Sequence, residues 1–308
     1  MNRFRDKSSE VLFNLHISRR GCLRLFMSAA GLYFALPCST ASAVPQTAGR
    51  SILEQFLGEA LTYEIGFWLF PHCGEASTRF LKAKQPGLYR ASMEGRSVGV
   101  VDLLMGRYRY SYVSYLELSP SGDRLRPLRF ELTKKQMGKK YRRTVTFDYS
   151  GKEITFSRSE GKGESQEKKM GMEEGIIYED YLTLFYNFRH GCYGPLERGR
   201  TYHLPLHIHE GMKSVDLSIA THEEEERHRQ SELNKVNKDF FLRFRVNEED
   251  VSSTTGEIEG WLSRESVPVK GTIKDVILFG DLWGSLIQRK VGGAHQRSPA
   301  RGEGLPSV

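Results

Sequence analysis

Residues 141–157 have the sequence Tyr-Arg-Arg-Thr-Val-Thr-Phe-Asp-Tyr-Ser-Gly-Lys-Glu-Ile-Thr-Phe-Ser, and this stretch decides the fold class of the chain. Two runs rich in Thr, Val, Ile and Phe lie on either side of Ser150-Gly151. β-branched and aromatic residues favour strands, and a short Ser-Gly connection favours a tight turn. We therefore predict an antiparallel β-hairpin centred on Ser150-Gly151.

The same alternation extends through most of the chain in both directions. Leu128, Phe130 and Leu132 alternate with charged residues, as expected for a strand with one buried face. The predicted strands are separated by turn sequences such as Gln85-Pro86-Gly87 and not by helices. This arrangement predicts an antiparallel architecture. About twelve strands are predicted. Besides those already named, they lie at residues 62–67, 78–80, 88–93, 108–118, 201–209, 214–220, 239–246, 257–263, 268–274 and 276–279.

Three segments interrupt the strand pattern. Residues 179–189 carry apolar residues at helical spacing between Asp180 and Gly191, which predicts one short internal helix. Residues 159–174 and 223–237 are strongly charged, and we predict that both are solvated loops.

These patterns together predict a mainly β domain over residues 58–290. Strands with an apolar face would form a partly open barrel or a strongly curved antiparallel sheet with one short internal helix. Residues 44–57 are expected to be a linker, and residues 291–308 a disordered tail.

The first 43 residues resemble a bacterial twin-arginine export signal. Arg19 and Arg20 precede an apolar run, and Ala41-Ser42-Ala43 follows as a cleavage site. The run is shorter than the roughly 20 residues that a spanning helix needs. We therefore expect cleavage after Ala43, delivery to the periplasm or beyond, and the twin-arginine machinery as a partner.

Three alternatives to cleaved export are open at this point. An uncleaved leader would be an N-terminal membrane anchor. A lipoprotein would use Cys38, although Pro37 fits that site poorly. A cytosolic protein could carry Arg19-Arg20 in its first helix, but the order of basic, apolar and small residues argues against it.

The net charge of the chain is +7, and much of it belongs to the leader. Residues 1–43 hold six of the 45 Lys and Arg and two of the 38 Asp and Glu, which leaves a net charge of +3 for the rest. A nucleic-acid-binding protein usually concentrates basic residues on one face or helix. No nucleic-acid partner is expected.

Several segments, taken in order, resemble an exported bacterial family known as domain of unknown function 3108. Residues 58–65 are similar to its first strand, residues 126–130 with 141–148 to its central hairpin, residues 180–189 to its short helix, and residues 261–263 with 268–269 to a late strand pair. The resemblance covers roughly residues 58–290. It implies an exported, mainly antiparallel β domain, and it implies no enzymatic activity and no catalytic residues. The charged stretch at residues 223–237 and the leader depart from the family pattern.

Three histidines are the best chemical candidates in the sequence. Period-2 alternation over residues 201–209 places His203, His207 and His209 on one strand face, where they could bind zinc or copper. His222 and His228 could add ligands. The alternative is a solvent-facing strand with polar residues, which is the more frequent case, and no cofactor is expected.

Tyr108, Tyr110 and Tyr112 form a second candidate, because they share one strand face. They could line an apolar ligand site, or they could pack in the core. Base stacking is a weaker interpretation, since the envelope contains little nucleic acid.

Cys73 and Cys192 are the two cysteines outside the leader. An oxidising compartment permits a disulfide between them, and two unpaired, partly buried thiols are an equal alternative. His72 beside Cys73 does not indicate a thiol enzyme, because neighbouring residues of a strand point to opposite faces.

No catalytic motif emerges from the sequence. A His-Glu-x-x-His motif, a phosphate loop and a dinucleotide fingerprint are all absent. The Gly-x-Ser-x-Gly spacing occurs once, at residues 95–99, and this spacing alone is a weak signal of a catalytic serine. We therefore favour a non-enzymatic periplasmic or envelope protein that binds an apolar ligand such as a lipid, or a partner protein of the envelope. A metal-binding or metal-dependent protein is the alternative.

Overall fold

The computed structural model describes residues 50–67, 70–104, 106–161, 163, 165–211, 214–230, 239–276 and 280–292. The predicted export signal with Arg19 and Arg20, the cleavage site at Ala41 and Ala43, and nearly all of the predicted tail lie outside the described residues.

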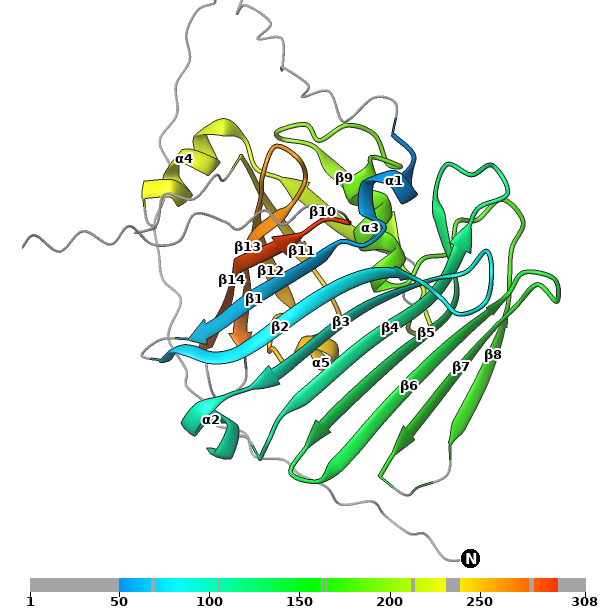
Figure 1. Cartoon of the computed structure of the whole chain (residues 1–308), viewed down its shortest axis with the longest axis horizontal. Helices are drawn as coiled ribbons and strands as arrows, with labels where there is room; N and C mark the ends of the chain where they lie inside the picture. Colours follow the sequence, from blue (N-terminus) through cyan, green and yellow to red (C-terminus); the bar gives the residue numbers. More distant parts are fainter. Residues whose placement is uncertain are drawn as a thin grey trace, which may run out of the picture. The chain divides into compact units, whose positions relative to one another are not determined.

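Fourteen strands and five short helices make up the described chain (Figure 1). The first half contains α1 (Ile52–Phe56), β1 (Ala60–Phe67), β2 (Phe70–Lys82), β3 (Tyr89–Ser97), α2 (Gly99–Leu104), β4 (Arg109–Leu118), β5 (Leu125–Gln136), β6 (Lys139–Asp148), β7 (Glu153–Glu160) and β8 (Gln166–Gly171). The second half contains α3 (Tyr181–His190), β9 (Thr201–Pro205), β10 (Ser214–Ile219), α4 (His222–Gln230), β11 (Phe240–Arg245), α5 (Glu248–Val251), β12 (Glu257–Leu262), β13 (Pro268–Val276) and β14 (Gly280–Lys290).

All fourteen strands form one antiparallel sheet in the order β8-β7-β6-β5-β4-β3-β2-β1-β14-β13-β12-β11-β10-β9. Strands that follow one another along the chain pair within β1–β8 and within β9–β14, and β1 pairs with β14, which joins the two halves. The prediction of a mainly β, antiparallel fold is confirmed. The sheet is neither closed nor strongly curled, with β8 and β9 as its edges, so the expectation of a partly open barrel or a strongly curved sheet is not met. The chain between these edges forms α3, which packs on β3, β4 and β5.

The hairpin predicted at residues 141–157 is present as β6 and β7. The Asp148 carboxylate accepts hydrogen bonds from the backbone N–H groups of Ser150 and Gly151, which fixes the turn. Val145 and Ile154 are fully buried on one face. We call this face of the sheet the inner face.

Three hydrophobic clusters cover much of the inner face. One joins β5, β6 and β7 to Tyr178, Leu206, Ile208 and Val215. A second joins Phe188 of α3 to strands β9–β12, and a third packs α1 and α3 against β2–β5. The core therefore lies between the sheet and α3.

The helix predicted at residues 179–189 is confirmed as α3. Asp180 caps its first turn by accepting hydrogen bonds from the N–H groups of Leu182 and Thr183, and Gly191 ends it in the left-handed conformation. Arg189 near its end forms a buried, two-point ion pair with Glu59 at 2.7 and 2.9 Å. This pair fixes α3 to the segment before β1.

Three sequence-based expectations were wrong, and one strand was missed. Residues 52–56 of the predicted linker form α1, because Ser51 and Glu54 make a capping box. Residues 166–171 of the first charged loop pair with β7 as β8. Residues 222–230 of the second form α4, with acids in its first turn and bases in its last. Strand β14 was not predicted at all.

Candidate functional site

The inner face carries a row of glycines where the two halves of the sheet meet. Gly260, Gly271 and Gly284 lie opposite one another on β12, β13 and β14. Gly284 lies opposite Ile65 on β1, and Ile65 opposite Gly74 on β2. Directly opposed residues of antiparallel strands share a face. Four of the five positions across these strands therefore lack a side chain.

A second row, two residues away, is apolar. Ile258, Ile273 and Leu282 lie opposite one another on β12, β13 and β14, and Leu282 lies opposite Phe67 on β1. The first three are half-buried, although they are apolar residues on the inner face. We call the glycine row with Ile65 and these three residues the inner apolar surface.

Open space lies above part of the glycine row. A Cβ atom placed on Gly271 would meet only the carbonyl oxygen of Glu259, at 3.8 Å. A Cβ atom on Gly284 would meet the side chain of Ile65 at 3.0 Å. Within the described residues, no side-chain atom lies within 4 Å of that Cβ position on Gly271. This part of the inner face can accept an added apolar group.

The three predicted tyrosines lie next to this surface, on one face of β4 and the residue before it. The Tyr108 and Tyr110 rings lie 6.2 Å apart, and the Tyr110 and Tyr112 rings 5.6 Å apart. Tyr110 folds over Gly95 of β3, where a Cβ atom would come within 2.2 Å of the ring. Burial raises the pKa of Tyr110 and Tyr112 above the ordinary value. The prediction of a shared face is confirmed, and Tyr112 belongs to the core.

The tyrosine row ends at a buried polar cluster around Asp250. Its carboxylate contacts Arg143 at 2.9 Å and His209 at 2.6 Å, and the Tyr181 hydroxyl donates to it at 2.8 Å. Burial raises the pKa of Asp250, but His209 and Arg143 favour the charged form, and the pKa lies below its usual value. The Tyr112 hydroxyl donates to the carbonyl of the same residue at 3.1 Å. These groups satisfy one another's hydrogen-bonding capacity and charge, which is typical of a structural cluster.

The structure does not bring the three predicted histidines together. His203 is exposed and contacts Asp216 at 2.7 Å. His207 is buried, with its ring 4.6 Å from that of Tyr178. His209 belongs to the Asp250 cluster. The strand ends at Pro205, so strict alternation fails after that residue. Among the described residues, no group of three or more His, Cys, Asp and Glu could hold a metal ion.

Cys73 and Cys192 are both free thiols. Cys73 is buried against Phe67 and Val101, whereas Cys192 follows α3 and contacts the carbonyl of Asp123 at 3.6 Å. They belong to different parts of the core, and the predicted disulfide is therefore not formed. The alternative of two unpaired, partly buried thiols is what the structure contains.

Two adjacent buried carboxyl groups lie at the start of α3. The Glu179 carboxylate accepts hydrogen bonds from Tyr193 at 2.6 Å and Asn187 at 2.7 Å, and Asp180 accepts one from Ser114 at 2.5 Å. Burial raises the pKa of Glu179 to about 7 and that of Asp180 to about 6. Sequence reasoning identified Asp180 as a helix start but missed the buried pair.

Two hollows elsewhere on the described surface are lined mainly by charged residues. One of about 290 Å³ is lined by Asp216, Arg243, Phe244, Arg245 and Glu257, and one of about 220 Å³ by residues around His228. No helix among the described residues has the length and apolar character to cross a membrane. The inner apolar surface remains the best candidate site.

Comparison with known proteins identifies the family of the chain. Residues 62–281 match the model of the family described as "Protein of unknown function (DUF3108)". The chain belongs to the DUF3108 family. The expected resemblance is confirmed over most of the predicted β domain. No curated protein and no solved structure shows a significant match.

The glycine row was missed by sequence reasoning, although a signal existed. Gly260, Gly271, Gly284 and Gly74 each lie within a strand, where an isolated glycine often marks a close approach of another group. That signal does not show that the four share one row. Only the register of the DUF3108 sheet reveals it.

Proposed function

We propose that this DUF3108 protein is a non-enzymatic, exported β protein that binds an apolar ligand, such as the acyl chain of a lipid, on its inner apolar surface. One observation carries the proposal: the inner face is covered by α3 over β3–β5, whereas a Cβ atom on Gly271 would meet no side chain within 4 Å, beside half-buried Ile258, Ile273 and Leu282. Half-buried apolar residues around unfilled space are the usual lining of a ligand site.

The size of the surface suits a long apolar chain. The glycine row crosses β12, β13, β14, β1 and β2, and four interstrand steps of about 4.8 Å span roughly 19 Å. At Gly271, where a Cβ atom would meet no side chain within 4 Å, a ligand can approach the backbone directly. Ile65 supplies an apolar contact in the middle of the row.

The buried charged groups support a binding role over a catalytic one. Glu59 pairs with Arg189, and Asp250 with Arg143 and His209, and each set is buried within the core. A catalytic group needs access to a reacting atom, and these groups are directed to one another instead. Export to the periplasm or beyond is supported by the sequence of the first 43 residues.

The ligand site is tested by filling it. Purified protein is titrated with cis-parinaric acid, a fluorescent fatty acid, and compared with Gly271→Leu. The added side chain should occupy the open space and weaken binding by about 10-fold or more, because it displaces contact worth ~1.5 kcal/mol. Far-UV circular dichroism should remain that of the unmodified protein.

The matched control is Gly171→Leu in the edge strand β8. A Cβ atom there would meet nothing within 4 Å, so the same substitution is equally tolerated but lies outside the inner apolar surface. Wild-type affinity is expected. The proposal is wrong if the unmodified protein does not bind the probe, or if folded Gly271→Leu binds it as tightly as Gly171→Leu does.

A further inference from the structure

Exposed apolar side chains gather at one end of the sheet, outside the inner apolar surface. Helix α2 exposes Val100, Leu103 and Leu104 by 67, 78 and 69 %, while its Val101 is buried at 4 %. Met137, in the turn between β5 and β6, is 70 % exposed. Single exposed apolar residues are ordinary, but a group of this kind on a folded element indicates an interaction site.

Met137 lies against the end of α2, so the exposed residues of the helix and of the turn are neighbours. The Met137 N–H donates to the carbonyl of Gly106, after α2, at 2.9 Å, and the Met137 side chain occupies the space where a Cβ atom of Gly106 would lie. Helix α2 also contacts β2, whose first residue, Phe70, is 41 % exposed. We call Phe70, Val100, Leu103, Leu104 and Met137 the apolar tip.

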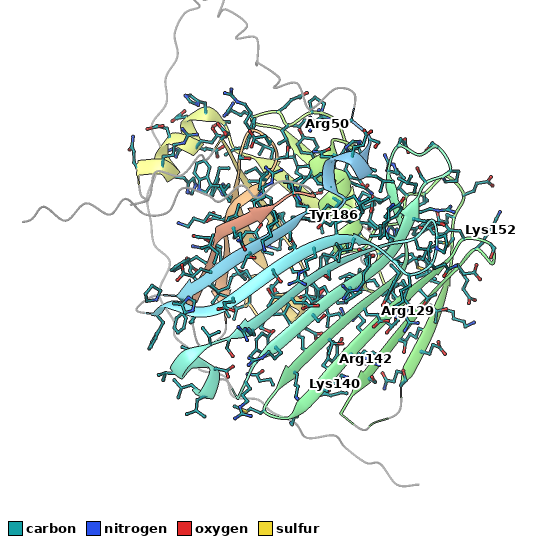
Figure 2. All side chains as sticks on the ribbon, viewed as in Figure 1. Arg50, Arg129, Lys140, Arg142, Lys152 and Tyr186 are labelled. Atoms are coloured by element: carbon teal, nitrogen blue, oxygen red, sulfur yellow. The ribbon has the colours of Figure 1, made fainter. Side chains whose placement is uncertain are left out.

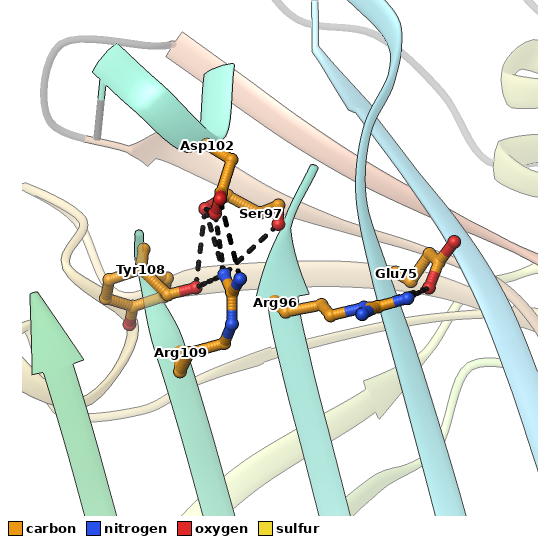
Figure 3. A network of polar contacts seen from close by, with 6 residues as sticks. All are labelled: Glu75, Arg96, Ser97, Asp102, Tyr108 and Arg109. Atoms are coloured by element: carbon orange, nitrogen blue, oxygen red, sulfur yellow. Dashed lines mark hydrogen bonds and ion pairs between the residues drawn. The ribbon is translucent and has the colours of Figure 1, made fainter. Parts of the chain in front are cut away.

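A polar network holds α2 in place, so the exposure of its leucines is a fixed feature of the fold. The Asp102 carboxylate accepts hydrogen bonds from Ser97 and Arg109, each at 2.6 Å (Figure 3). Arg109 also donates to the carbonyl oxygens of Ser97 and Tyr108 at 3.2 and 2.7 Å. Hydrogen bonds from Arg109 and Ser97 lower the pKa of Asp102, which keeps the network charged.

Met137 occupies a position that favours other residues. Met137 and Gly138 both have positive φ angles, 50° and 77°, as in a type I′ hairpin turn. Asn or Asp is the usual partner of Gly there, because a long side chain rarely adopts this conformation. An exposed methionine in this turn is a departure from local preference, and such departures concentrate at functional positions.

Basic side chains surround the apolar tip. Arg107, Lys135, Lys139 and Lys140 are exposed, and none has an ion-pair partner among the residues that the structure describes. Figure 2 shows Lys140 at the start of β6, at the end of the sheet that carries α2. Of the acids at this end, Asp102 pairs with Arg109 and Asp281 with Lys274. Exposed Glu160 at the end of β7 and exposed Asp275 before β14 have no ion pair among the described residues.

We propose that the apolar tip docks on the surface of an anionic lipid bilayer. The leucines and Met137 would enter the boundary between headgroups and acyl chains, and the four basic side chains would contact lipid phosphates. Apolar residues ringed by Lys and Arg have the chemistry that such a surface recognises. A protein partner would more often meet an apolar patch with a mixed or neutral polar rim.

The proposal is tested by flotation of the full chain with vesicles of 30 % phosphatidylglycerol in phosphatidylcholine, against phosphatidylcholine alone. Lys139→Gln/Lys140→Gln should weaken binding about 30-fold, since two near-surface cations are removed. Leu103→Ser/Leu104→Ser should weaken it more than about 100-fold. Raising the salt concentration should weaken binding of the unmodified chain.

Matched variants at other parts of the sheet test whether vesicle binding depends on the apolar tip itself, rather than on the total charge of the chain or on residues 1–49. Lys82→Gln/Lys84→Gln removes two exposed lysines from the opposite end, and Leu81→Ser/Ile287→Ser removes two exposed apolar residues. Both should bind as the unmodified chain does. On vesicles, amide hydrogen exchange should slow at residues 99–107 and 135–140.

Three results would overturn the docking proposal. Equal binding to charged and neutral vesicles would remove its electrostatic basis. Equal binding of tip and control variants, or unchanged exchange at both tip segments, would place the contact elsewhere. Absence of vesicle binding would leave a protein as the partner of the tip. Each outcome is independent of cis-parinaric acid binding, because Gly271 lies outside the tip.

Discussion

Two regions of the same inner face have opposite characters. Over β5, β6 and β7 the inner side chains are fully covered: Phe130, Leu132, Val145 and Ile154 are each 0 % exposed. Over β12, β13 and β14 the inner residues around Gly271 are glycines and half-buried apolar residues, although Leu262 at the end of β12 is buried. The sheet is continuous between them, so the difference arises from what packs on it. A cluster with Leu206, Ile208 and Val215 covers the first region, and no described side chain lies within 4 Å of a Cβ position on Gly271 in the second.

The covered region therefore contributes mainly to the stability of the fold, whereas the open region is available for binding. A covered apolar residue contributes its full transfer free energy and its packing contacts. A half-buried one contributes less to folding and keeps free surface for a ligand. We therefore expect substitutions in the two regions to differ in size and in kind.

Truncating one apolar side chain in each region should show the largest contrast. Phe130→Ala should lower the free energy of unfolding by ~3–5 kcal/mol, because it leaves a cavity in a fully buried cluster. Ile273→Ala should cost about 1 kcal/mol, since its side chain is half-buried. Urea unfolding followed by circular dichroism measures both. Similar losses for the two variants would mean that the β13 surface is as covered as the β5 surface.

A second prediction concerns the pH dependence of stability, which depends on the two buried carboxyl groups at the start of α3. Burial raises the pKa of Glu179 to about 7 and that of Asp180 to about 6, so the folded state holds protons that the unfolded state releases earlier. Stability from these groups is fully present below the unfolded pKa of about 4.5 and is lost as pH rises toward 7. The loss for Glu179 should be on the order of 3 kcal/mol.

The measurement is the free energy of unfolding at several pH values between 4.5 and 8. Glu179→Gln keeps an oxygen that can accept from Tyr193 and Asn187 but cannot ionise, so its profile should be flatter. Glu167→Gln, on the exposed strand β8, is the control and should keep the slope of the unmodified protein. A slope that persists in Glu179→Gln would assign the pH dependence to other groups.

Much of the covered region could be predicted from the sequence, because its information is local. Alternation around Val145 and Ile154 and the Ser150-Gly151 turn identify a hairpin without any tertiary knowledge, and Asp180 with Gly191 marks a helix. The open region depends on pairing between distant segments. Strand β14 has mixed composition and is a strand because β1 and β13 hold it on both sides.

The same reasoning explains the site predictions. Tyr108, Tyr110 and Tyr112 share a face, as period 2 requires, because they follow one regular strand. The three histidines do not, since regular pairing ends at Pro205 and the chain leaves the strand. The burial of Glu179 and Asp180 could not be predicted, because acidic residues are rarely buried. Their burial depends on hydrogen bonds that Ser114, Tyr193 and Asn187 donate to the two carboxyl groups.

The smallest predicted effect compares a covered glycine of β3 with the open Gly271 of β13, each changed by a single methyl group. Gly95→Ala should destabilise the protein by ~1–3 kcal/mol, because its Cβ atom would lie 2.2 Å from the Tyr110 ring, which must then shift. Gly271→Ala should instead be neutral or stabilise by up to ~1 kcal/mol. Its Cβ atom meets only a carbonyl oxygen at 3.8 Å, and the unfolded chain loses freedom. Neither glycine has a positive φ angle, so backbone strain does not confuse the comparison. The midpoints of urea unfolding measure the two effects, provided that the free energy of unfolding depends equally on urea concentration in both variants. If Gly271→Ala destabilised the fold as Gly95→Ala does, a side chain would have to lie over β13. The open half of the inner face would then be filled by the protein itself, leaving no room there for a ligand.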